Sequence, residues 1–237
     1  MRTVLFWDFD GTLAEAPHIW SNTLHRLLLE AAPDCGVTLA GIRQYTARIF
    51  PWDTPDADHT KAVYDAWWRY MEAQFLMTYR ALGVTEDQSR AAVCGVRPCL
   101  LDPANYRLYP DAVDTLARCR ALGYENYILS NNFPELPDLV RALGLADFIN
   151  GCAVSACAGY DKPRPEFFAY AKRLAGAADV HYMIGDNPIA DVEGGRTAGM
   201  RTILVHKDVP NTADHVCATL APIPDILQIR DEDGACG

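Results

Sequence analysis

The chain has 237 residues and a mass of 26.2 kDa, which suits one large domain or one and a half. Half of the residues are hydrophobic and 22% are charged, which excludes a mostly disordered chain. The formal net charge of −10 disfavours duplex DNA or RNA as a general partner. A small phosphorylated ligand is not excluded, because a local cluster of cations can override the mean charge.

The sequence gives no sign of a membrane segment. No apolar run reaches the roughly 18 residues that a membrane helix needs, and the run Val4–Trp7 is too short for the core of a signal peptide. The eight cysteines include no Cys-x-x-Cys pair, so we expect reduced thiols that act as small hydrophobic side chains. These features predict a cytoplasmic protein, and they do not indicate an oligomeric state.

The first 105 residues predict one strand followed by helices. Thr3–Trp7 is a short apolar run of strand type, and Asp10-Gly11 behind it is a turn signal. Helices are expected at about 16–32, 38–49 and 60–82, and from Thr85 toward Cys94, with a proline-containing loop at 51–56. The long third helix carries a group of large side chains that form either the core of this segment or a wall against an apolar ligand: Tyr64, Trp67, Trp68, Tyr70, Met71 and Phe75.

After Pro110, strands alternate with helices. Helices are expected at 111–122, 136–143, 165–175 and 189–198, and strands at 127–129, around 148 and 154, at 180–184 and at 202–205. The tail from Asp231, with Gly234 and Gly237, is expected to be frayed. This alternation predicts an α/β fold, a Rossmann-like doubly wound parallel sheet. The core then comprises residues 1–14 and 106–237, and the helical segment 15–105 is inserted after the first strand.

Polar side chains follow the predicted strands at their carboxyl ends, where open parallel sheets bind ligands. They are Asp8 and Asp10 after the first strand, Ser130 and Asn131 after the second, Asp186 after a later one, and Lys162 in the loop before helix 165–175. Three carboxylates at one edge repel each other unless a divalent cation joins them, and Mg²⁺ prefers oxygen ligands. A cation beside a lysine suits an anionic substrate, most simply a phosphoryl group.

The spacing Asp8-Phe9-Asp10 has a chemical reason. Residues i and i+2 of an extended strand end face the same side, so one carboxylate can attack phosphorus while the other reaches the leaving oxygen. Gly11 permits a turn that brings main-chain N–H groups close to a phosphate, so we expect it to bind substrate.

Four stretches in this order resemble the motifs of the haloacid dehalogenase superfamily, on its phosphatase branch. They are Asp8-Phe9-Asp10-Gly11-Thr12-Leu13, Ile128-Leu129-Ser130-Asn131-Asn132, Asp161-Lys162-Pro163-Arg164-Pro165, and Gly185-Asp186-Asn187-Pro188-Ile189-Ala190-Asp191. The resemblance covers residues 1–14 and 106–206. The helical segment matches the cap of that family only in position and helicity.

The resemblance implies a role for each motif residue. Asp8 is similar to the nucleophile that forms a phospho-enzyme, and Asp10 to the acid that protonates the leaving alcohol and then activates water. Ser130 and Lys162 resemble the residues that bind and neutralise the phosphoryl group. The implied magnesium site comprises Asp8, Asp10 through its carbonyl, Asp186 and, nearby, Asp191.

The sequence thus predicts a Mg²⁺-dependent phosphatase that acts on a small phosphorylated metabolite: a sugar phosphate, phosphoglycolate or a nucleoside monophosphate. Asn131 and, from the helical segment, Arg48 and Trp52 are expected to contact this substrate, with Arg43 and His59 close by. Three alternatives remain open at this point. They are a phosphomutase, a 2-haloacid dehalogenase, which in that family lacks an acid at the position of Asp10, and a phosphate-binding protein without turnover.

Overall fold

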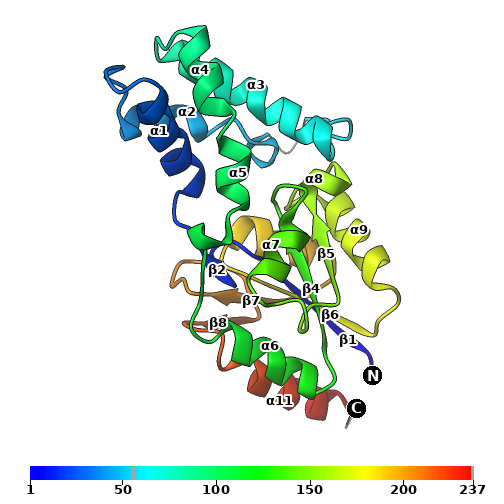
Figure 1. Cartoon of the computed structure of the whole chain (residues 1–237). Helices are drawn as coiled ribbons and strands as arrows, with labels where there is room; N and C mark the ends of the chain where they lie inside the picture. Colours follow the sequence, from blue (N-terminus) through cyan, green and yellow to red (C-terminus); the bar gives the residue numbers. More distant parts are fainter. Residues whose placement is uncertain (55–56, 236–237) are drawn as a thin grey trace.

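The computed structural model describes residues 1–54 and 57–235. Figure 1 shows an α/β core at the bottom and a group of helices above it. We call the helical segment, residues 15–105, the cap. The first strand, β1 (Thr3–Trp7), lies in the sheet of the core, and the chain leaves this strand to enter the cap.

The core is built on a six-stranded sheet in the order β5-β4-β1-β6-β7-β8, with every neighbouring pair parallel. Its other strands are β4 (Glu125–Ser130), β5 (Gly151–Val154), β6 (Val180–Gly185), β7 (Arg201–Val205) and β8 (His215–Cys217). The chain reverses its direction of travel across the sheet at β1, which pairs with both β4 and β6. The predicted doubly wound fold is therefore confirmed, and its switch point lies beside β1.

Successive side chains of β1 enter different hydrophobic clusters on the two faces of the sheet. Leu5 and Trp7 pack in the larger cluster, which includes α6 (Ala112–Ala121), α7 (Leu136–Ala142) and α11 (Ile223–Ala235). Val4 and Phe6 pack in a second cluster with α9 (Pro165–Ala175). This burial on both faces explains why β1 is a continuous apolar run and not an alternating one.

The cap contains α1 (Ile19–Ala31), α2 (Leu39–Thr46), α3 (Asp65–Ala81), α4 (Glu86–Val93) and α5 (Val96–Leu101). A capping box opens α4, because Thr85 Oγ1 accepts from the Gln88 backbone N–H and Gln88 Oε1 accepts from the Thr85 backbone N–H. The long third helix begins only at Asp65, five residues later than predicted. Two short strands, β2 (Ala14–Glu15) and β3 (Arg107–Leu108), pair antiparallel where the chain enters and leaves the cap.

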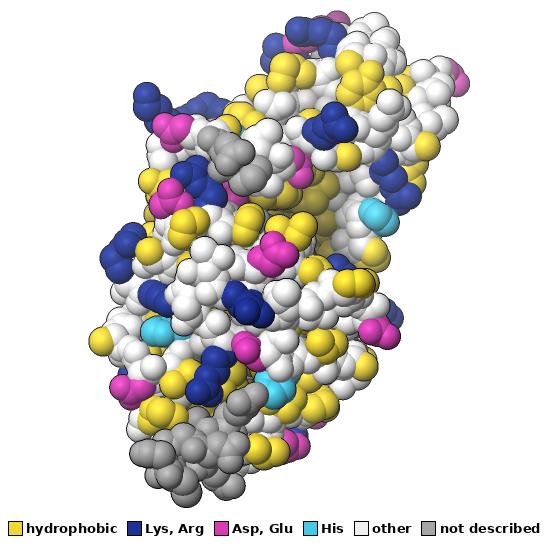
Figure 2. Space-filling model, turned by 180° about the vertical axis from the view of Figure 1, so that it is seen from behind, with side chains coloured by type: hydrophobic (Ala, Val, Ile, Leu, Met, Phe, Trp, Pro, Cys, Tyr) yellow, Lys and Arg dark blue, Asp and Glu magenta, His cyan; other side chains and the backbone are white. Residues whose placement is uncertain are grey.

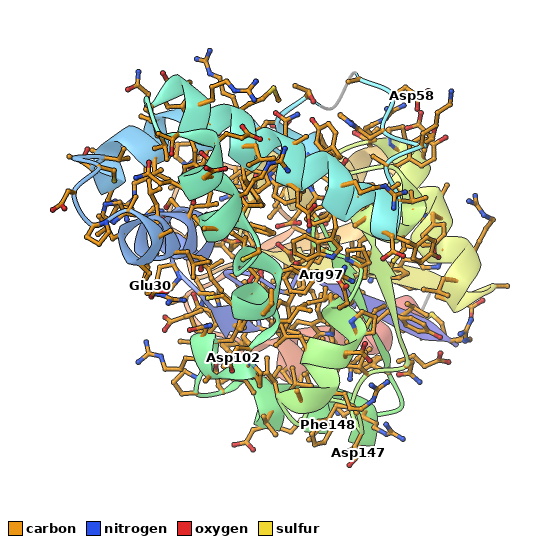
Figure 3. All side chains as sticks on the ribbon, turned by 45° about the horizontal axis from the view of Figure 1, so that its top comes forward. Glu30, Asp58, Arg97, Asp102, Asp147 and Phe148 are labelled. Atoms are coloured by element: carbon orange, nitrogen blue, oxygen red, sulfur yellow. The ribbon has the colours of Figure 1, made fainter. Side chains whose placement is uncertain are left out.

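The cap is held on the core through the loop that follows β4. The Trp68 indole donates to Glu135 Oε2 at 2.9 Å, and the Arg97 guanidinium forms an ion pair with the same carboxylate. Arg97 lies where α5 approaches the core, below α3 (Figure 3). Phe133 stacks against Trp68 with ring centroids 6.0 Å apart. A carboxylate of the core thus receives two donors from two different cap helices.

Several sequence predictions differ from the structure. No strand forms around Phe148, and the residues before β5 make a turn. The predicted helix 189–198 is divided into a π-helix, η3 (Pro188–Glu193), and α10 (Gly194–Thr197). The tail expected to be frayed from Asp231 continues as α11 to Ala235, and Gly237 lies outside the described residues. Pro55 and Asp56 of the predicted loop 51–56 also lie outside them.

Candidate active site

The predicted catalytic residues come together at the carboxyl ends of β1, β4 and β6. A cavity of about 340 Å³ opens there between the core and the cap. Its core lining includes Asp8, Asp10, Ser130, Asn131, Lys162 and Asp186. Parallel strands bring these residues together, although more than 170 positions separate Asp8 from Asp186 in the chain.

Asp8 is oriented by two donors at one of its oxygens. Its Oδ1 accepts from the Phe9 amide at 2.8 Å and from Lys162 Nζ at 2.9 Å. Its Oδ2 accepts no hydrogen bond from the residues that the structure describes. One oxygen is thus fixed and the other is left to react.

Lys162 is a buried ammonium held between two carboxylates. Its side chain is 2% exposed and lies 2.9 Å from Asp8 Oδ1 and 2.6 Å from Asp191 Oδ1. Burial lowers the pKa of Lys162, but the ion pairs with Asp191 and Asp8 outweigh burial and raise that pKa above its ordinary value. Asn131 fixes the backbone of this lysine, since its side-chain amide exchanges two hydrogen bonds with the Lys162 N–H and carbonyl. Lys162 is therefore charged and immobile.

Asp10 lies beside Asp8 in a different environment. Its Oδ1 is buried without a hydrogen-bond partner in the described part of the chain, and its Oδ2 accepts from Asn132 Nδ2 at 2.8 Å. Burial, followed by repulsion from Asp8 and then from Asp186, raises the pKa of Asp10 to about 7, against a weaker opposing effect of Asn132. The carboxyl group can therefore hold a proton near neutral pH, as a general acid must.

The donors present fit a divalent cation. Carboxylate oxygens of Asp8, Asp186 and Asp191 lie within 4.8 Å of one another. Asp191 is already engaged by Lys162 and by the Asn187 backbone N–H, and Asp186, which is partly buried, forms an ion pair with Lys207 at 2.7 Å. Two buried carboxylates and one partly buried carboxylate this close together suit Mg²⁺, which prefers oxygen ligands.

Gly11 lies in the turn after β1, close to Asp186. Its N–H donates to the Ala14 carbonyl at 2.8 Å, so this group is used within the turn. The φ of Gly11 is +82°, and a Cβ at this position would lie 2.7 Å from Asp186 Oδ2. The absence of a side chain at Gly11 therefore leaves room for the carboxylate of Asp186.

Asn187 and Ala190 complete the core lining, and the cap supplies the other residues of the cavity wall. Its lining residues there are Ala16, His18, Ile19, Trp20 and Trp52, so the predicted contact from Trp52 has a place in the structure. Arg48 is exposed and is not among the lining residues, and neither are Arg43 and His59. The large side chains of α3 do not line the cavity. Trp67, Trp68, Met71 and Phe75 are buried in the hydrophobic core that includes the cap.

Sequence reasoning assigned no role to several residues that the structure places here. Asn132 pairs with Asp10, His18 and Trp20 line the cavity, and Lys207 contacts Asp186. Asn132 follows Ser130 and Asn131 directly, so its position alone could have drawn attention to it. Asp161, which begins the third motif, is buried at 3% exposure, and burial raises its pKa.

A family model described as haloacid dehalogenase-like hydrolase matches residues 2–199. The chain belongs to the haloacid dehalogenase-like hydrolases. It is 31% identical over 163 residues to human haloacid dehalogenase-like hydrolase domain-containing protein 3, an alignment that covers 68% of this chain and 63% of the relative. It is 36% identical over 104 residues to phosphoserine phosphatase from Thermus thermophilus, covering 43% of this chain and 42% of that protein. The chain thus spans less than two thirds of these curated relatives.

Solved structures of this superfamily share the fold. The putative HAD-hydrolase YfnB from Bacillus subtilis, whose crystals contain magnesium, aligns with a TM-score of 0.74 and 24% identity over 96% of this chain and 98% of that one. L-2-haloacid dehalogenase from Xanthobacter autotrophicus aligns with a TM-score of 0.69 and 18% identity over 96% and 99%. Fold similarity therefore extends to proteins with different chemistry, and the site has to decide between them. None of the described helices is long and apolar enough to span a membrane.

Proposed function

We propose that this protein is a Mg²⁺-dependent phosphatase that hydrolyses a small phosphomonoester through an aspartyl-phosphate on Asp8. The observation that carries this proposal is the second carboxyl group, Asp10. It lies beside the nucleophile and has its pKa raised to about 7 by burial and by its acidic neighbours. A dehalogenase of this family is expected to lack an acid there, because a halide leaves without a proton. The relative named phosphoserine phosphatase supports the same conclusion.

The residues would act in two steps. Asp8 Oδ2 attacks phosphorus, the bond from phosphorus to the leaving oxygen breaks, and Asp10 transfers its proton to that oxygen. Asp10, now a carboxylate, takes a proton from water as the water oxygen attacks phosphorus. The bond between phosphorus and Asp8 then breaks, which releases inorganic phosphate and restores the free carboxylate. Lys162 and Ser130 offset and bind the charge on the phosphoryl oxygens in both steps.

Asp8, Asp186 and the carbonyl of Asp10 would hold the metal, with Asp191 positioning Lys162 beside them. Mg²⁺ would supply electrostatic neutralisation of the phosphoryl group. We also propose that residues 15–105 form a separate cap domain on a core of residues 1–14 and 106–237, that the protein acts in the cytoplasm, and that its partner is a small phosphorylated metabolite.

The test is hydrolysis of p-nitrophenyl phosphate with Mg²⁺ present. Wild type should release p-nitrophenol and inorganic phosphate, and EDTA should stop the release. Asp8→Asn should abolish turnover with an unchanged circular dichroism spectrum. Turnover that survives either treatment contradicts the mechanism, and chloride release from 2-chloropropionate would favour the dehalogenase instead.

A further inference from the structure

We propose that the cap selects substrates whose leaving group is an uncharged, flat, apolar ring, and that it discriminates against substrates with a second negative charge. This inference rests on the proposed phosphatase function and names the class of its substrate. Two observations support it. The cap residues that line the cavity are mostly apolar or aromatic, and the lining has no lysine or arginine other than Lys162.

The cap wall of the cavity is aromatic and aliphatic, built from Ala16, His18, Ile19, Trp20 and Trp52. The two indoles are held in place by Phe50, which stacks on Trp52 at a centroid distance of 4.6 Å and an interplanar angle of 3°. Trp20 lies 5.0 Å from the same ring. Seen from behind, the surface is hollowed between cap and core, and hydrophobic side chains gather around this hollow (Figure 2). A rigid indole pair favours a planar group that stacks against it.

Among the described residues that line the cavity, no lysine or arginine lacks a carboxylate partner. Its only lysine or arginine is Lys162, which is already paired with Asp8 and Asp191. His18 is an exposed residue of this lining. A Mg²⁺ ion and a phosphoryl dianion bring equal and opposite charges, so together they leave the net charge of the cavity unchanged.

None of the arginines of the cap is among the residues that line the cavity. Arg43 donates to Asn22, Arg97 pairs with Glu135, and Arg48 is exposed away from the lining. Lys207 does not line the cavity and is paired with Asp186 at 2.7 Å. A carboxylate on the leaving group would therefore be moved from water to a wall of indole and aliphatic carbon where no lining cation is unpaired. Such a transfer is costly for an ionised group.

The volume sets a size limit. A cavity of about 340 Å³ is at the lower end of the range of about 300–1,000 Å³ for small-molecule sites. This space suits a phosphoryl group with one small leaving group. A phenyl ring is the simplest leaving group that fits both the space and the wall.

A matched pair of substrates tests the charge rule. Phenyl phosphate and 4-carboxyphenyl phosphate differ by one carboxylate on the same ring. We expect kcat/KM of the wild type to be about 30-fold or more higher for phenyl phosphate. The same preference should appear in the dissociation constants of both esters for Asp8→Asn, measured by calorimetry with Mg²⁺ present. Equal values for the two esters in the binding experiment would overturn the inference.

Substitutions in the wall test which residues carry the selection. Trp52→Ala should raise KM for phenyl phosphate about tenfold with a smaller effect on kcat, and Trp52→Phe should restore most of the loss. Ile19→Arg places a cation on the wall and should narrow or reverse the preference against 4-carboxyphenyl phosphate. Tyr45→Ala, which removes an exposed aromatic ring of α2 outside the cavity, is the matched control and should leave both constants unchanged.

The outcomes separate this inference from the function on which it rests. If neither ester is hydrolysed but Asp8→Asn binds phenyl phosphate more tightly than 4-carboxyphenyl phosphate, the phosphatase proposal fails. The inference that the cap selects against a second negative charge then stands. If both esters are hydrolysed at similar rates and Ile19→Arg changes nothing, the enzyme is a phosphatase whose cap does not select by charge.

Discussion

Replacing Gly11 by alanine tests whether this glycine makes room for Asp186 in the proposed metal site. Two effects are expected. The backbone has a φ of +82°, which costs a residue with a Cβ about 1–2 kcal/mol. The new methyl carbon would also lie 2.7 Å from Asp186 Oδ2 and 2.8 Å from its Cγ, well inside ordinary contact distance. Asp186 must therefore move by several tenths of an ångström.

Gly83 provides a control for the backbone effect alone. Its φ is +81°, and a Cβ there would meet nothing within 4 Å. Gly83→Ala should cost the same 1–2 kcal/mol in urea unfolding without changing the response to Mg²⁺. The difference between the two variants then isolates the contact with Asp186.

We expect Gly11→Ala to raise the Mg²⁺ concentration for half-maximal hydrolysis about 10–100-fold, since ligand displacement has effects of this size. The increase in melting temperature that Mg²⁺ produces should shrink in parallel, which gives a readout independent of turnover. If Gly11→Ala responds to Mg²⁺ as Gly83→Ala does, Asp186 is not a ligand or its position does not depend on Gly11.

Three further experiments address the buried charges and the cap. Because the folded pKa of Asp10 is raised to about 7 from 3.8, its contribution to the stability of the metal-free protein is fully present below pH 3.8 and is lost as the pH rises through 7. Urea unfolding in EDTA should show this loss from about pH 4 to pH 7, with little further change above pH 8, and a slope that Asp10→Asn leaves unchanged would contradict it. Lys162→Met leaves Asp8 and Asp191 without their counter-ion and should lower the free energy of unfolding at pH 7.5 by about 3–5 kcal/mol, whereas an unaltered denaturation midpoint would show that the pair is not maintained. Glu135→Ala removes the acceptor shared by two cap helices, so amide hydrogen exchange should quicken in α3 but not in α9, and equal rates in α3 of both proteins would argue against this anchor.

The sequence alone was enough to predict the α/β core and the residues that meet at its edge. The apolar run Thr3–Trp7 is buried on both faces of the sheet, and the motif residues Asp8, Ser130 and Asp186 each follow a strand that the local pattern predicts. These predictions use only residues that are close together in the chain, because a short apolar run and the turn residues after it indicate a strand and its end. Parallel pairing then brings all such ends to one edge.

Element boundaries and the tail were less predictable. Phe148 lies in a turn and not in a strand, and α11 continues past Asp231 to Ala235. Element boundaries depend on more than the local pattern on which such predictions rest. The division of the helix after Asp186 into η3 and α10 likewise has no sequence signal that we can identify.

The tertiary structure decided which cap residues face the catalytic carboxylates. Arg48 and Trp52 are four positions apart and were equally plausible from the sequence, yet only Trp52 lines the cavity, where His18 and Trp20 join it from the start of α1. The sequence fixes how each cap helix is patterned, but the face that meets the site depends on how the helices pack and how the cap is anchored at Glu135. The residues of the candidate site therefore belong to short local motifs that the sequence shows directly. The cap residues that line the cavity are brought there by contacts between residues far apart in the chain.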